Sequence, residues 1–77
     1  MKLRKKRELL SAKEISKHFD LSYQSVNYYT NIGLFKVSSN RGNKRLYSLR
    51  HVTLVLKKIR TFKRRGYSLR VIRDELI

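Results

Sequence analysis

The stretch Ser22-Tyr-Gln-Ser-Val-Asn-Tyr-Tyr-Thr-Asn-Ile-Gly33 predicts a short helix with two different sides. At about 100° of rotation per helical residue, Val26 and Tyr29 point to one side, and we expect both in the core. The opposite side carries only uncharged polar groups, those of Gln24, Asn27, Tyr28 and Asn31. Asn and Gln can pair with the adenine edge that the major groove displays. We therefore interpret this side as a DNA-reading surface.

The charge of the chain indicates a polyanionic partner. Its 77 residues include 20 Lys and Arg but 5 acidic residues, so the formal net charge is +15 and the pI is near 10.9. Such a surface repels itself and binds phosphates in a salt-dependent way. A membrane partner is not expected, because the charge is not accompanied by an exposed apolar segment or a bulky hydrophobic helix face.

Length and composition favour one small domain held together by helix packing, since the chain contains no cysteine and no proline. The two histidines are far apart in sequence, so we expect no metal site and no cofactor. No nucleophile with its base, carboxylate pair or phosphate-binding loop is recognisable, so we expect no catalytic site. The basic start, residues 1–7, is not followed by an apolar run, which favours a cytoplasmic, nucleoid-associated location.

Two capped helices joined by a tight turn are predicted in the first half of the chain. Ser11-Ala-Lys-Glu14 has the spacing of a capping box, and it begins a helix over residues 12–19. Ser22 is a good N-cap for the next helix, residues 23–31, which Gly33 ends. This arrangement is typical of a helix-turn-helix, in which the second helix enters a groove.

A small hairpin is expected beyond Gly33. The runs Leu34-Phe-Lys-Val37 and Arg45-Leu-Tyr47 are compatible with strands, and the turn-forming residues 38–43 separate them. We expect Tyr47 to pack its ring on the third helix rather than to touch DNA. The hairpin reads as a wing, and its tip carries three cations that could contact phosphates or a minor groove: Arg41, Lys44 and Arg45.

Two further helices are predicted in the second half. Ser48 caps the third, in which apolar residues recur at helical spacing until Gly66, and Ser68 caps a fourth that runs to the chain end. The third helix also carries six cations and no acid between residues 57 and 65. Of these, Arg64 and Arg65 beside the turn are the best candidates for phosphate contacts.

The order of these pieces resembles the DNA-binding domain of the MerR family of bacterial transcription regulators. The resemblance covers about residues 9 to 77 and rests on Ser11-Ala-Lys-Glu-Ile15, Leu21-Ser-Tyr-Gln-Ser-Val-Asn-Tyr-Tyr29, Ile32-Gly-Leu34, Gly42-Asn-Lys-Arg-Leu-Tyr47, Val52, Gly66-Tyr-Ser-Leu69 and Ile72. It implies a second wing from the last two helices, and dimeric binding to promoter DNA that is bent or underwound. By motif position, it implies DNA contacts from Asn27, Tyr28, Arg45, Arg65 and Tyr67.

Several positions depart from the family pattern. Asn27 stands where the family usually has Arg, so an amide replaces a charged contact and the preferred sequence is expected to differ. Asp20 replaces the usual turn glycine, as an Asp that tolerates positive φ, and His51 replaces a common Asp. Family members continue into a long coiled-coil helix, whereas this chain ends at Ile77. The chain is then either a fragment or a stand-alone DNA-binding module that uses its charge, its basic arm or another protein in place of the missing helix. In the second case we expect a homodimer on DNA or dimerisation through another protein.

The sequence therefore predicts a mostly α fold: a winged helix-turn-helix with four short helices and a small β-hairpin wing, residues 10–77, preceded by a basic N-terminal arm, residues 1–9. The expected partner is double-stranded DNA, and the function is that of a transcription regulator or the DNA-binding part of one. The candidate DNA contacts are Gln24, Asn27, Tyr28, Asn31, Lys13, Arg41, Lys44, Arg45, Arg64, Arg65 and Tyr67.

Three other functions remain open at this point. An architectural or excisionase-like recombination accessory protein would use the same winged domain to bend DNA beside partners. An RNA-binding protein would share the charge, although the stacking sheet or clamp loop of common RNA modules is missing. A protein-interaction module without nucleic acid would leave the charge unexplained.

Overall fold

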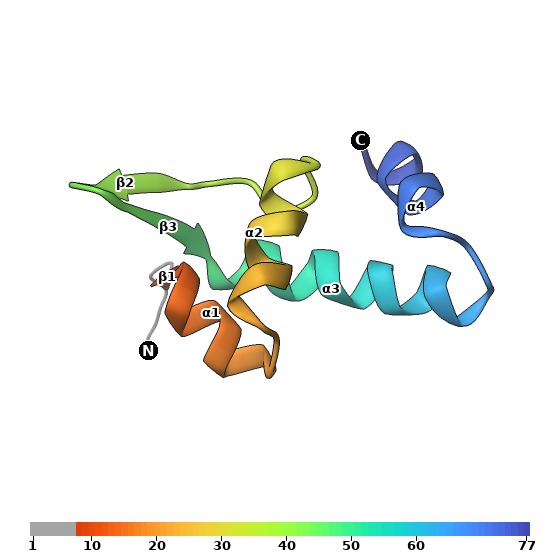
Figure 1. Cartoon of the computed structure of the whole chain (residues 1–77), viewed down its shortest axis with the longest axis horizontal. Helices are drawn as coiled ribbons and strands as arrows, with labels where there is room; N and C mark the ends of the chain where they lie inside the picture. Colours follow the sequence, from red (N-terminus) through yellow and green to blue (C-terminus); the bar gives the residue numbers. More distant parts are fainter. Residues whose placement is uncertain (1–7) are drawn as a thin grey trace, which may run out of the picture.

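The computed structural model describes residues 8–77, and the N-terminal arm predicted for residues 1–9 lies outside it except for Glu8 and Leu9. Four helices and three short strands follow one another along the chain (Figure 1). Their bounds are β1 Leu9–Ser11, α1 Ala12–Phe19, α2 Tyr23–Asn31, β2 Ser39–Arg41, β3 Lys44–Ser48, α3 Leu49–Arg64 and α4 Leu69–Leu76. The predicted mostly α winged helix-turn-helix is thereby confirmed.

The helix-turn-helix forms as its local sequence predicts. The backbone N–H of Ser11 donates to the Glu14 carboxylate at 2.8 Å, and the Glu14 N–H donates to Ser11 Oγ at 3.2 Å, which completes the capping box. Asp20 ends α1 with φ +56°, the left-handed conformation expected there. The Leu21 N–H then donates to the Ser16 carbonyl at 2.8 Å, which turns the chain toward α2.

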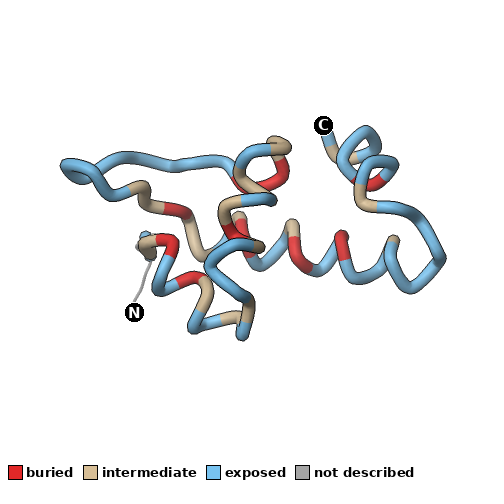
Figure 2. The backbone as a smooth tube through the Cα atoms, in the orientation of Figure 1, coloured by how far each residue is buried: buried red, intermediate tan, exposed pale blue. Residues whose placement is uncertain are grey.

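The core lies where the helix-turn-helix, β3 and α3 meet, with α4 covering the far part of α3 (Figure 2). Val26 of α2 is fully buried, as predicted, and Tyr29 packs at the edge of the core with its ring 5.2 Å from that of Phe35. The ten buried apolar residues are Ala12, Ile15, Val26, Leu34, Phe35, Tyr47, Val52, Leu56, Ile59 and Ile72.

The sheet has one strand more than predicted. Its order is β1-β3-β2, and both neighbours of β3 are antiparallel to it, with Leu10 opposite Tyr47 and Asn40 opposite Arg45. Leu9, predicted to belong to the N-terminal arm, pairs with Ser48. A strand of three residues that runs directly into a helix cap is too short to show an alternating pattern, so it was missed.

The first strand of the wing was predicted at the wrong place. Residues 34–37 form no strand, and β2 lies instead at Ser39–Arg41, within the segment expected to be a turn. Leu34 and Phe35 are both buried, although neighbouring strand residues would face opposite sides. Their N–H groups donate to the Tyr29 carbonyl at the end of α2. Only Gly42 and Asn43 form the turn, where Gly42 has φ +61°.

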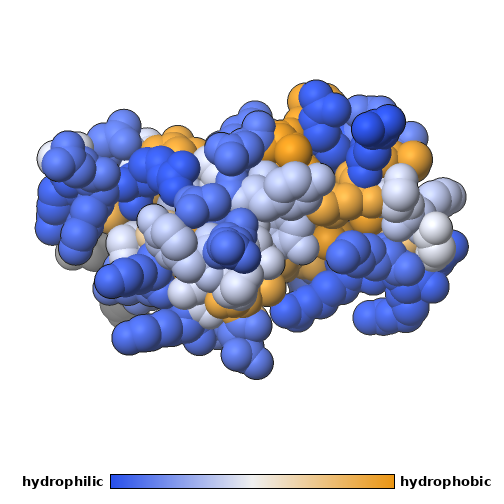
Figure 3. Space-filling view, viewed as in Figure 1, coloured by the Kyte–Doolittle hydropathy of each residue, from blue (hydrophilic) through white to orange (hydrophobic). Residues whose placement is uncertain are grey.

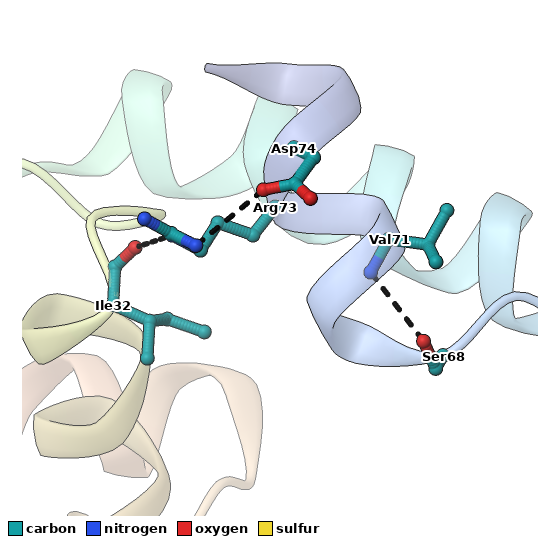
Figure 4. Close-up of polar contacts among 5 residues, drawn as sticks. All are labelled: Ile32, Ser68, Val71, Arg73 and Asp74. Carbon is teal, nitrogen blue, oxygen red and sulfur yellow. Dashed lines mark hydrogen bonds and ion pairs between the residues drawn. The ribbon is translucent and has the colours of Figure 1, made fainter.

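The fourth helix is tied to the end of α2 by one side chain. The Nε–H of Arg73 donates to the Ile32 carbonyl at 2.9 Å, and an Nη1–H donates to Asp74 at 3.4 Å (Figure 4). At its other end α4 is capped by Ser68, whose Oγ accepts the Val71 N–H. Arg73 therefore satisfies a carbonyl that the helix end leaves without an intrahelical partner.

A buried hydrogen bond joins the sheet to α2. Tyr47 of β3 is completely buried, and its hydroxyl lies 2.8 Å from Thr30 Oγ1. Thr30 donates its own proton to the Val26 carbonyl at 2.7 Å, so Tyr47 is the donor in the pair. Tyr47 is thus in the core, where its hydroxyl contacts Thr30 of α2 and its ring centre lies 6.4 Å from that of Phe35.

Replacing either partner of this bond should destabilise the domain, but by different amounts. Tyr47→Phe removes the donor and is expected to lower the free energy of unfolding by about 1 kcal/mol. Thr30→Val leaves the buried Tyr47 hydroxyl without an acceptor, and its cost is expected to be larger, about 1–3 kcal/mol. Urea denaturation of both variants measures the difference. Equal losses, or a larger loss for Tyr47→Phe, would contradict the donor assignment.

Candidate nucleic-acid interface

The polar side of α2 is exposed and free of charge. Gln24, Tyr28 and Asn31 are solvent-exposed, Asn27 is half-buried, and no Lys, Arg, Asp or Glu occurs anywhere in the helix. In the space-filling view, the central surface is a mixture of pale and blue residues, with an orange apolar patch beside it toward α4 (Figure 3). Uncharged donors and acceptors on an exposed helix are the groups that major-groove reading requires.

The wing tip brings together cations from two elements. Arg41 and Lys44 flank the Gly42-Asn43 turn and are exposed. They line a shallow groove with Lys13 and Lys17 of α1, next to Glu14. The pKa of the Glu14 carboxyl is lowered mainly by the backbone N–H of Ser11, then by the Ser11 side chain and by the charge of Lys44. Lys13, predicted as a DNA contact, thus lies beside the wing rather than isolated on α1.

Arg45 differs from the other wing cations because it contacts the reading helix. Its Nη2–H donates to Oδ1 of Asn27 in α2. The guanidinium carbon also lies 5.9 Å from the centre of the Tyr47 ring, within the range of a cation–π contact. The sequence predicts Arg45 on the wing and Asn27 on the second helix as separate contacts, and the structure brings them together. No local pattern reveals a contact between residues 18 positions apart.

A third group of candidates lies at the turn between α3 and α4. Arg64, Arg65 and Tyr67 are all exposed there, and the Tyr67 ring leans on Phe62 with 5.4 Å between ring centres. The wing and this turn lie at opposite ends of the longest axis, with α2 between them (Figure 1). That axis is 39 Å long, close to the length of one turn of duplex DNA.

A histidine contacts the connector between α2 and the wing, residues 32–38. His51 of α3 accepts the backbone N–H of Lys36 through Nε2 at 3.1 Å. Burial is the main cause that lowers the pKa of His51 below the ordinary value of 6.5. A backbone hydrogen bond with Leu34 acts in the opposite direction, and the charge of Lys36 adds to the lowering. The neutral ring is therefore the form that holds the connector.

Comparison with known proteins identifies the family. The family model described as MerR HTH family regulatory protein matches residues 10–76. The chain belongs to the MerR family. Among solved structures, it is similar to a MerR-family transcriptional regulator from Bacillus cereus, with 30% sequence identity and a TM-score of 0.73. The match covers 90% of this chain but 52% of that one, so this chain spans about half the length of that relative. No curated protein matches.

Family membership makes residues 10–76 a MerR-type helix-turn-helix DNA-binding domain, and the family is not enzymatic. Within residues 8–77, no cluster of three or more His, Cys, Asp or Glu side chains could hold a metal ion. Each helix in this part of the chain is too short or too polar to cross a bilayer.

The lowered pKa of His51 makes stability depend on pH. Between pH 6.5 and the lower pKa of the folded state, the unfolded chain binds a proton that the folded domain does not. Stability should therefore fall as the pH drops from 7.5 to 5.5. His51→Gln should reduce this slope, because an amide oxygen can accept the Lys36 N–H without titrating. Thermal unfolding of both proteins at pH values from about 5.5 to 7.5 measures the slope of stability against pH.

The matched control is His18→Gln, which removes the other histidine, exposed on α1. A reduced slope in His51→Gln that His18→Gln does not share would be specific to the ring that contacts Lys36. An unchanged slope in His51→Gln would show that the ring does not hold the connector in the way described.

Proposed function

We propose that this domain reads double-stranded DNA in a sequence-dependent way, as a transcription regulator or as its DNA-binding part. Helix α2 enters the major groove, and the wing and the α3–α4 turn hold the phosphate backbone on either side. The observation that carries the proposal is the charge-free polar side of α2, which lies between two basic ends. A non-specific polyanion binder would have no use for a helix without cations in the middle of a +15 surface.

Base and phosphate contacts are divided between the elements. Gln24, Asn27, Tyr28 and Asn31 face the base edges from α2, and Arg45 reaches the same surface from the wing. Tyr67 supports the phosphate-binding turn, where its ring packs on Phe62. The remaining cations neutralise phosphates: Lys13, Arg41, Lys44, Arg64 and Arg65.

Two copies bound to adjacent half-sites form the complex that we propose for a palindromic operator. One domain reads one half-site, and its 39 Å length spans about one helical turn. The match covers 52% of the B. cereus relative, so a regulator of that length has a further segment that could link two copies. A separate protein is the alternative link. We place the complex on the bacterial nucleoid.

Selection of bound sequences from random duplexes tests the proposal. We expect one enriched motif, with a palindromic form bound by two copies when the mass of the complex is measured. Bound DNA without an enriched motif would favour the architectural, excisionase-like role instead. Stronger binding to structured RNA than to duplex DNA would contradict both.

The salt dependence of DNA binding measures how many phosphates the domain contacts. Five cations predict that the logarithm of the binding constant falls with log salt at a slope of about −4 to −5, a loss of roughly 250- to 1000-fold between 50 and 200 mM. Replacing both Arg64 and Arg65 by Ala should reduce the slope by about 2 for all sequences alike. Lys58→Ala, in the groove between α3 and Leu76, is the matched control and should leave the slope unchanged.

Gln24→Ala tests base reading. It should reduce the preference for the selected duplex over random DNA by about 1–3 kcal/mol and leave the salt slope intact. Titrations of both duplexes at one salt concentration measure the ratio. Equal weakening on the two duplexes would remove the base-reading role of this residue.

A further inference from the structure

Two contacts run side by side between the wing and α2. Arg45 and Tyr47 lie two residues apart on β3, so their side chains project from the same side of the strand. Asn27 and Thr30 lie three residues apart on α2, so they are neighbours on the helix. Tyr47 donates to Thr30 inside the core, and Arg45 donates to Asn27 nearer the surface. The buried contact therefore places the outer pair.

The outer contact changes what Asn27 can present to DNA. Pairing with adenine needs the amide oxygen and the amide nitrogen together. The oxygen of Asn27 already accepts the Arg45 N–H, and the Nδ2 group keeps its two donors. The adenine pairing expected from the sequence is thus disfavoured at this position, although Gln24 and Asn31 remain free of such a contact in the described structure.

Arg45, in contrast, keeps most of its donors. A guanidinium has five N–H groups, and Asn27 occupies one of the two on Nη2. The other Nη2–H still forms a two-donor edge, either with Nε–H or with an Nη1–H, depending on which side faces Asn27. A planar two-donor edge fits the O6 and N7 acceptors of guanine, which lie together in the major groove.

We propose that Asn27 is a positioning residue for Arg45, and that the pair reads one guanine of the operator as a unit. The inference rests on the proposed function, and it adds which wing residue reads a base and what holds it there. Asn27 restricts a long side chain before DNA arrives, so less conformational freedom is lost on binding. The Tyr47 ring supports the guanidinium from below, 5.9 Å away.

The test is a double-mutant cycle on the selected duplex. Arg45→Ala should weaken binding about 10- to 100-fold. Asn27→Ala should weaken it about 2- to 10-fold, through lost positioning. The double variant should bind as weakly as Arg45→Ala alone, because Asn27 acts through Arg45. Asn31→Ala is the matched control, because it removes an amide of the same helix that does not contact Arg45. The fold-changes in binding caused by Asn31→Ala and Arg45→Ala should therefore multiply in the double variant.

Modified DNA identifies the group that Arg45 contacts. Replacing the selected guanine by 7-deazaguanine should weaken the unmodified protein and leave Arg45→Ala unaffected. The guanine assignment is wrong if 7-deazaguanine has no effect, and a methylphosphonate at a neighbouring phosphate instead weakens binding of the unmodified protein but not of Arg45→Ala.

A measurement without DNA separates the positioning role from DNA binding. In NMR spectra of the free protein, the side-chain amide signals of Asn27 should shift in Arg45→Ala, and those of Asn31 should not. Unshifted Asn27 signals, or effects of Asn27→Ala and Arg45→Ala that multiply, would overturn the pairing while leaving DNA binding intact. Failure of the folded protein to bind any duplex would instead overturn the proposed function. Thermal unfolding confirms that each variant is folded.

Discussion

The hydrogen bond from Tyr47 to Thr30 fixes how the wing lies against α2. It joins the central strand of the sheet to the last turn of α2, and the Tyr47 side chain is completely buried, where an unmade bond is costly. Phe35 packs against both Tyr29 and Tyr47, so the connector between helix and wing is held by the same aromatic group. The wing therefore meets α2 at a defined spacing rather than as a free hairpin.

Local sequence patterns predicted the helices well because the signals that set their ends are local. The Ser11 capping box, the Ser22 cap and the positive φ of Asp20 depend on residues within a few positions of one another. The strands were predicted less well, since pairing partners lie far apart and β1 and β2 have three residues each. A buried dipeptide, Leu34-Phe35, also looks like a strand when nothing in the sequence reveals that its N–H groups close a helix.

For the candidate site too, features set by local sequence could be predicted and a long-range contact could not. The composition and helical spacing of residues 22–33 predict an exposed polar side without any tertiary information, and the structure has that side exposed. The contact between Arg45 and Asn27 could not be predicted, because it depends on how β3 packs against α2, which the burial of Tyr47 and its bond to Thr30 fix. A cation on a wing and an amide on a helix each look like independent DNA contacts until the fold places them together.

The scarcity of acid around these cations has a consequence for folding. In residues 8–77 the side chains form one ion pair, between the adjacent residues Arg73 and Asp74, and both are largely exposed. The positive charges of the folded domain are therefore balanced by mobile counter-ions rather than by the protein itself. Dissolved salt lowers this repulsion and stabilises the free domain, while it weakens the complex. The duplex acts as a fixed, dense counter-ion, so the bound domain is also the more stable one.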